Sequence, residues 1–148
     1  MSKFIIGFFG SKNNGKTSAL NEFIKKIEEI SKNNAIDILN SIGDDRLVTI
    51  LYKGNKLGIS TGGDLEEIVE QRLKLLHEEK CDLIITACRT NGGTHTAINQ
   101  YSNLYKVHYV SCPYLYLVDG EISEEKIAIN KAVFLCSYVD DILEEYVL

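Results

Sequence analysis

Long hydrophobic runs are missing from this chain of 148 residues. No apolar stretch approaches the roughly 20 residues that a helix needs to cross a bilayer, so we expect no membrane-spanning segment. The apolar run at residues 4–9 leads straight into a glycine-rich turn, with no small-residue cleavage site of the kind that ends a signal peptide. We therefore expect a soluble cytoplasmic protein.

Proline is also scarce, with one residue in the whole chain, and no segment is rich in Pro, Gly and Ser. Segments of that composition often link domains. Their absence, in a chain whose length suits one domain, predicts a single domain over residues 1–148. The sequence has no internal repeat, which argues against a repeat architecture.

The four cysteines lie far apart and form no C-x-x-C pair. This spacing argues against the disulfide framework of a small secreted domain and against a zinc cluster. We expect four reduced thiols.

Basic residues are fewer than acidic ones, 16 against 21, and the formal net charge is −5. Extensive contact with the phosphate backbone of DNA or RNA depends on clustered Lys and Arg side chains. Because both signs are spread along this chain, nucleic acid is not its favoured partner.

What the chain does contain is a full match to the phosphate-loop pattern G-x-x-x-x-G-K-[ST] at residues 10–17, a segment that we call the glycine loop. Its glycines let successive backbone N–H groups turn toward phosphates, while Lys16 reaches the outer phosphates and Thr17 offers a hydroxyl to Mg²⁺. The residues expected to bind nucleotide are Gly10, Ser11, Lys12, Asn13, Asn14, Gly15, Lys16, Thr17 and Ser18.

The segments on either side of the glycine loop agree with this interpretation. Residues 4–9 form a continuous apolar run, typical of a strand that is buried on both faces of a parallel sheet. Apolar residues then recur at helical spacing from Leu20 to Ile30. We therefore expect Lys16 and Thr17 to open a helix whose positive N-terminal end faces the phosphates.

Strands and helices alternate along the rest of the chain. Apolar runs predict strands at residues 35–39, 47–52, 56–61, 81–88 and 107–110, with a hairpin at residues 53–55. Helical spacing predicts one helix from Asp64 to near Lys80, with Asp64 and Glu67 as a capping box, and a C-terminal helix capped by Ser123. The pattern implies a three-layer α/β fold with a mostly parallel central sheet, which binds ligands outside the carboxyl ends of its strands.

Acidic residues that follow strand ends are candidates for the metal site. Asp64 is either linked to the metal, where it holds the water shell, or an N-cap of the following helix. Asp44 and Asp45 form a second acidic pair, but consecutive acids in a glycine-containing turn are ordinarily solvated. Asp82 begins its predicted strand, so we expect it on the opposite edge of the sheet.

The second informative segment is RTNGGTH at residues 89–95, directly after a predicted strand. Arg89 supplies a guanidinium that can clamp phosphate oxygens, and the two glycines permit close backbone approach. The alternative is a plain turn in which Thr94 caps a helix. The chain has only three arginines, Arg46, Arg72 and Arg89, and the last one stands at a strand's carboxyl end.

The strand, glycine loop and helix together resemble the phosphate-loop NTPase superfamily. That resemblance implies binding of a nucleoside triphosphate and Mg²⁺, with Lys16 on the β- and γ-phosphates and Thr17 on the metal. The loop alone is similar to the G-x-K-N-x-G-K-T loop of the molybdopterin-guanine dinucleotide biosynthesis accessory GTP-binding proteins, over about twenty residues. The deviant loop of partner-switched ATPases is not matched, because Ser11 stands where those proteins have an extra lysine.

These patterns favour ATP over GTP as the nucleotide. The chain has no [NT]-K-x-D guanine signature, since residues 55–58 read N-K-L-G and lack the final acid. This favours ATP over GTP, whereas the similarity to a GTP-binding loop favours GTP.

We therefore expect a Mg²⁺-dependent nucleoside triphosphatase or a nucleotide-operated switch. Lys16 and the loop amides would position the phosphates, Arg89 would neutralise transition-state charge, and Asp64 would hold the metal's water shell or position the attacking water. One alternative is a small-molecule or nucleotide kinase of the same fold. Another is a non-hydrolysing nucleotide sensor that docks a protein partner, or a second copy, through its C-terminal helix.

Overall fold

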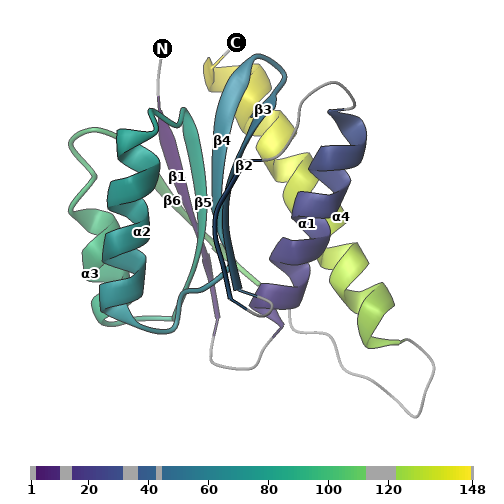
Figure 1. Cartoon of the computed structure of the whole chain (residues 1–148), viewed down its shortest axis with the longest axis horizontal. Helices are drawn as coiled ribbons and strands as arrows, with labels where there is room; N and C mark the ends of the chain where they lie inside the picture. The colour runs from purple at the N-terminus through teal and green to yellow at the C-terminus, as the bar shows by residue number, and fades with distance from the viewer. Residues whose placement is uncertain (1–2, 11–14, 32–36, 43–44, 113–122, 148) are drawn as a thin grey trace.

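The computed structural model describes residues 3–10, 15–31, 37–42, 45–112 and 123–147, and its strands form one sheet in the order β2-β3-β4-β5-β1-β6 (Figure 1). At its centre β1 (Phe4–Phe9) pairs in parallel with β5 (Leu83–Cys88) and β6 (Lys106–Ser111). Beyond β5 lies β4 (Asn55–Ser60), also parallel to it. The mostly parallel sheet predicted from the sequence is confirmed.

Two strands complete the sheet on the side of β4. β3 (Asp45–Tyr52) is antiparallel to β4, and β2 (Asp37–Ile42) is antiparallel to β3. A two-residue turn joins β3 to β4, and both of its residues have positive φ, 50° at Lys53 and 78° at Gly54. This is the backbone twist that tight hairpins favour, so the predicted hairpin is confirmed.

Four α-helices of the described residues cover the two faces of the sheet. α1 (Lys16–Ile30) and α4 (Glu124–Ile142) lie side by side on one face, and a short π-helical segment, η1 (Leu143–Val147), continues α4. α2 (Glu66–Glu78) and α3 (Gly93–Asn99) lie on the other face. The described residues therefore form a three-layer α/β fold, as predicted.

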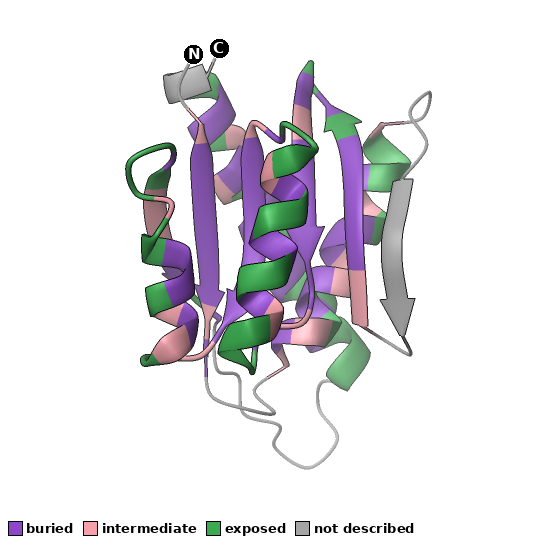
Figure 2. Cartoon of the chain, turned by 60° about the vertical axis from the view of Figure 1, so that its left-hand side comes forward, coloured by how far each residue is buried: buried purple, intermediate pink, exposed green. Residues whose placement is uncertain are grey.

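The core consists of two apolar clusters, one on each face of the sheet. Phe4, Ile6 and Phe8 of β1 pack toward α1 and α4, whereas Ile5 packs toward α2 and α3. β1 and β5 are buried along nearly their whole length, and Figure 2 shows that the outer side of α2 is exposed. Burial on both faces explains why the strand at residues 4–9 is continuously apolar.

The helix ends test the predicted caps. α1 begins at Lys16 as expected, after Gly15 in a left-handed conformation (φ 89°). α4 begins after Ser123, whose side chain accepts a hydrogen bond from the Lys126 N–H, so that cap is confirmed. The capping box at Asp64 and Glu67 is wrong, because α2 begins at Glu66 without a side-chain cap.

None of the helices in the described part of the chain is both long enough and apolar enough to cross a membrane.

The carboxyl ends of β1, β4 and β5 meet at the edge of the sheet where α1 begins (Figure 1). Three segments follow these strand ends: the glycine loop after β1, residues 61–65 after β4, and residues 89–92 after β5. The fold thus brings together the segments that carry Lys16, Asp64 and Arg89.

Candidate functional site

Lys16 joins three segments at this edge. Its Nζ donates to the carbonyl oxygen of Gly10 at 2.7 Å, to the carbonyl oxygen of Cys88 at 3.0 Å, and to Asp64 Oδ1 at 3.3 Å. The lysine side chain is only 6% exposed, while that of Asp64 is 45% exposed. The ammonium is therefore held between the ends of β1 and β5, with a carboxylate on its solvent side.

Lys16 is also the first residue of α1. The first turn of this helix contains no acidic residue. The first backbone N–H groups of a helix have no acceptor within the helix, and together with the helix dipole they favour an anion there. Thr17 is half-buried and Ser18 is exposed. The predicted nucleotide-binding residues Ser11, Lys12, Asn13 and Asn14 lie outside the described residues.

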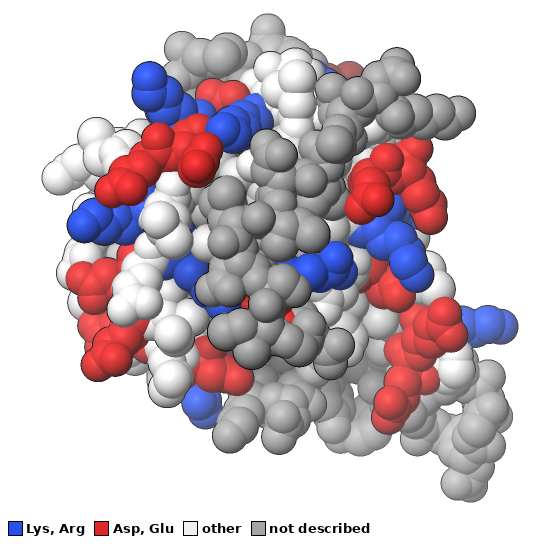
Figure 3. Space-filling model, viewed as in Figure 1, with Lys and Arg blue, Asp and Glu red and all other residues white. Residues whose placement is uncertain are grey.

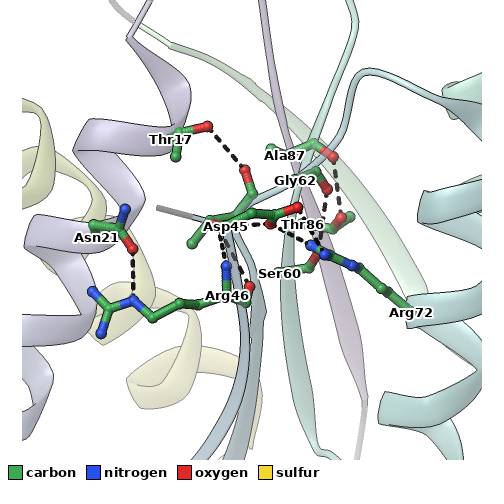
Figure 4. A network of polar contacts seen from close by, with 10 residues as sticks. Thr17, Asn21, Asp45, Arg46, Ser60, Gly62, Arg72, Thr86 and Ala87 are labelled. Carbon is green, nitrogen blue, oxygen red and sulfur yellow. Dashed lines mark hydrogen bonds and ion pairs between the residues drawn. The ribbon is translucent and has the colours of Figure 1, made fainter. Parts of the chain in front are cut away.

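Thr17 connects the glycine loop to the segment after β4. Its Oγ1 donates to the carbonyl oxygen of Thr61 at 3.3 Å (Figure 4). Thr61 is buried and held by β3, because its N–H donates to the Arg46 carbonyl at 3.0 Å and its Oγ1 accepts from the Arg46 N–H at 2.8 Å. The Thr17 hydroxyl is therefore positioned by the β3–β4 hairpin.

An ion pair that the sequence did not predict supports the same segment. Arg72 of α2 makes two hydrogen bonds to Asp45, Nη1 to Oδ1 at 2.6 Å and Nη2 to Oδ2 at 2.8 Å (Figure 4). Arg72 Nη1 also donates to Ser60 Oγ at 3.1 Å, and Thr61 Oγ1 lies 3.1 Å from Asp45 Oδ1. The chain of contacts from Thr17 through Thr61 and Asp45 to Arg72 links α1, β3, β4 and α2.

The expectation that Asp45 is merely solvated is wrong. Its carboxylate is 39% exposed but is bound to an arginine side chain that is 8% exposed. Asp44 lies outside the described residues. The sequence did contain one signal for the pair, since Arg72 stands among the apolar residues of α2 that face the sheet, Val69, Leu73 and Leu76. A charged residue on such a face requires a partner.

Two glycines let the segment after β4 pass close to its neighbours. A Cβ on Gly63 would lie 1.9 Å from the carbonyl oxygen of Ala87 in β5, and a Cβ on Gly62 would lie 2.7 Å from Arg72 Nη1. No side chain fits at Gly63 without a backbone shift. This close passage brings Asp64 within reach of Lys16.

Arg89 lies at the same edge, one residue after the Cys88 carbonyl that binds Lys16. Its backbone is fixed by α3: the Arg89 N–H donates to Thr94 Oγ1 at 3.0 Å, and His95 Nε2 donates to the Arg89 carbonyl at 2.7 Å. The predicted Thr94 cap is wrong, because the residue at the N-cap is Gly92. The half-buried Arg89 guanidinium makes no hydrogen bond or ion pair within the described part of the chain.

Cys88 is not a nucleophile of this site. Burial raises the pKa of its thiol to about 12, although the nearby Lys16 opposes the shift. A thiol with that pKa stays protonated at neutral pH, and the thiolate is the reactive form. The four cysteines are buried and none forms a disulfide, as predicted.

The described residues contain no group of three or more His, Cys, Asp or Glu side chains that could hold a metal ion by themselves. Mg²⁺ is commonly held by one or two protein oxygens together with phosphates and water, so a smaller set suffices. The Thr17 hydroxyl oxygen and the half-exposed Asp64 carboxylate fit that requirement.

Asp82 lies at the opposite edge, as predicted. Its Oδ2 accepts a hydrogen bond from the Lys56 N–H at 2.9 Å, and its carbonyl accepts from the Phe4 N–H. Both contacts join strand beginnings, so Asp82 is a structural residue.

Acidic and basic side chains are interspersed on the face of the molecule in Figure 3, which shows no continuous basic surface among the described residues there.

Comparison with protein-family models, with curated proteins and with solved structures gives no match to this chain.

Proposed function

We propose that this protein binds a nucleoside triphosphate on the glycine loop and acts as a Mg²⁺-dependent NTPase or nucleotide-operated switch. The observation that carries the proposal is the position of Lys16. It is the first residue of α1, it follows a left-handed glycine, and its ammonium is nearly buried at the edge where β1 and β5 end. A fixed cation beside a helix N-terminus suits a polyanion.

The other residues at the edge support the same proposal. Thr17 and Asp64 would hold Mg²⁺, which supplies neutralising charge to the phosphates when bound. The backbone of Arg89 is held at the same edge by α3. Its guanidinium would stabilise negative charge that develops on the transferred phosphoryl group. ATP is the favoured nucleotide, because the sequence lacks the guanine signature.

Turnover with product analysis tests this function. The purified protein is incubated with MgATP or MgGTP, and released phosphate and nucleotide products are quantified for the wild type and Lys16→Ala. We expect phosphate release that Lys16→Ala reduces at least about a hundredfold. Phosphate transfer to an added acceptor instead of water would favour a kinase, and the absence of both turnover and binding would contradict the proposal.

A second candidate, a nucleotide sensor that docks a partner through α4, has one observation in its favour. The helix exposes three large apolar side chains, Ile129, Val133 and Phe134, to between 38% and 43%. Tight nucleotide binding without turnover, together with a solution mass that rises with protein concentration, would favour this candidate over the NTPase.

A further inference from the structure

A second buried lysine lies beside the glycine loop. Lys131 belongs to α4, and its residue is 6% exposed. Its Nζ lies 3.0 Å from the point where a Cβ on Gly15 would stand. The Lys131 ammonium therefore lies at the Gly15 end of the glycine loop, whereas the Lys16 ammonium binds the Gly10 carbonyl at its other end.

The fold explains how a residue so distant in sequence reaches this place. α1 and α4 lie side by side, and both begin at the edge where the parallel strands end (Figure 1). Lys131 stands on the buried face of α4, which also includes Ile127, Ala128, Ala132 and Leu135. A lysine can bury its methylene stem among such residues while its ammonium reaches a polar edge.

Cys112 is a second neighbour of Lys131 near the glycine loop. This residue follows β6, and its N–H donates to the Phe9 carbonyl at 2.8 Å, one residue before the glycine loop. Burial raises the pKa of the Cys112 thiol, and Lys131 and Lys16 both oppose that shift, Lys131 also through a hydrogen bond. The Lys131 ammonium therefore lies close to the Cys112 thiol, next to the start of the glycine loop.

The Lys131 ammonium adds positive charge beside Gly15, at the N-terminal end of α1, where the helix dipole already favours an anion. The effect grows with the charge of the anion. A chain of two or more phosphates offers a separate phosphate group to each lysine, whereas a single phosphate does not.

We infer that Lys131 is a second phosphate-binding residue, which contacts a phosphate oxygen of the ligand at the Gly15 end of the glycine loop. The inference rests on the proposed function and assigns a second cationic side chain to the phosphate chain of its ligand. It implies that inorganic tripolyphosphate binds through the same contact as the triphosphate of a nucleotide.

Calorimetric titration tests the inference with MgATP, MgGTP, inorganic tripolyphosphate and AMP as probes. Lys131→Gln removes the charge and Lys131→Arg keeps it, while Lys126→Gln removes an exposed charge from the same helix. We expect Lys131→Gln to lower the affinity for MgATP and for tripolyphosphate by about tenfold or more, and to lower the affinity for AMP by less. The affinities of Lys131→Arg should stay within about threefold of those of the wild type, and Lys126→Gln should bind all probes like the wild type.

The outcomes separate this inference from the proposed function. If Lys131→Gln binds like the wild type while Lys16→Ala fails to bind, Lys131 is not a ligand contact but the proposed function stands. Lys131 is likewise excluded as a phosphate contact if its replacement weakens only nucleotides and leaves tripolyphosphate binding intact. If the wild type binds none of the nucleotides or tripolyphosphate, both proposals are overturned.

Amine labelling of the wild type keeps the test independent of any folding defect in the variants. Bound tripolyphosphate should slow acylation of Lys131 and Lys16, measured by peptide mass spectrometry, and leave Lys126 unaffected. Equal labelling of Lys131 with and without tripolyphosphate, in protein that binds the probe, would overturn the inference.

Discussion

Asp64 Oδ1 lies 3.3 Å from Nζ of Lys16, although 48 residues separate the two in the sequence. The carboxylate therefore balances the charge of the lysine from the solvent side of the site. Phosphate oxygens of a bound nucleotide would compete with Asp64 for the same ammonium. A carboxylate displaced in this way stays at the edge of the sheet, where it can serve Mg²⁺.

Asp64→Asn should separate these two roles. Without metal, removal of the competing negative charge should leave nucleotide binding unchanged or tighten it by a few fold, whereas the gain in affinity on addition of Mg²⁺ should shrink by about tenfold. Calorimetric titration of ATP in EDTA and in Mg²⁺ measures both. Glu67→Gln, an exposed acid in α2, is the matched control. A full Mg²⁺ effect in Asp64→Asn would exclude this carboxylate from the metal site.

The ion pair between Asp45 and Arg72 should respond asymmetrically to mutation. Asp45→Ala leaves a nearly buried guanidinium without its carboxylate and should lower the free energy of unfolding by about 3 kcal/mol. Arg72→Met leaves a carboxylate that water can reach, so its cost should be nearer about 1 kcal/mol. Urea denaturation of both variants measures the difference.

An exposed ion pair provides the control for that comparison. Lys56 and Glu79 lie 3.2 Å apart on the surface, so Glu79→Gln should cost less than about 1 kcal/mol. Equal losses for Asp45→Ala and Glu79→Gln would mean that the buried arginine does not depend on Asp45.

Gly63→Ala should damage the site and the fold together. A methyl group there would meet the Ala87 carbonyl, so the segment before Asp64 must shift, at a cost of about 1–3 kcal/mol. Gly54→Asn is the control. Apart from its two chain neighbours, no atom of the described residues stands within 4 Å of its Cβ position, and Asn tolerates its positive φ. Thermal denaturation and nucleotide titration should show lower stability and weaker nucleotide binding only for Gly63→Ala. Wild-type behaviour of that variant would disprove the close contact between Gly63 and the Ala87 carbonyl.

The raised pKa of Tyr52 should make the stability of the fold depend on pH. Burial and the acceptor Asp140, 2.6 Å from the phenol oxygen, raise its pKa from 10.0 to about 12. Above pH 10 the unfolded chain loses this proton while the folded chain keeps it, so the unfolded state binds fewer protons. Stability contributed by the neutral phenol is complete below pH 10 and falls between pH 10 and 12, by up to about 1.4 kcal/mol per pH unit.

Tyr52→Phe isolates this contribution. Urea denaturation at pH 9, 10 and 11 should show a shallower loss of stability for the variant than for the wild type. Because other tyrosines and cysteines also titrate late, only the difference between the two proteins is informative. Parallel pH profiles would contradict the raised pKa of Tyr52.

The fold was predictable where one physical signal dominated. The doubly buried β1 appears in the sequence as an unbroken apolar run, and the start of α1 is marked by Gly15 and Lys16. Asp64 was less predictable, because the same residue type suits an N-cap and a lysine partner, and the choice depends on how Gly62 and Gly63 route the chain.

The missed parts of the site come from residues that meet only in three dimensions. Arg72 and Lys131 both interrupt apolar faces of helices, a pattern that indicates buried charge but does not name the partner. Asp45 and Gly15 lie far from them in sequence, on β3 and at the start of α1. Strand order and helix packing decide those contacts, and neither is encoded in local spacing.

Nucleotide binding by the glycine loop is tested most directly by calorimetric titration of MgATP and MgGTP into the wild type and Lys16→Ala, with folding of both checked by circular dichroism. Binding of at least one nucleotide by the wild type, weakened by about a hundredfold or more in a folded Lys16→Ala, is the expected result. Absence of binding to the folded wild type, or equal affinity of the two proteins, would contradict a phosphate site built on Lys16.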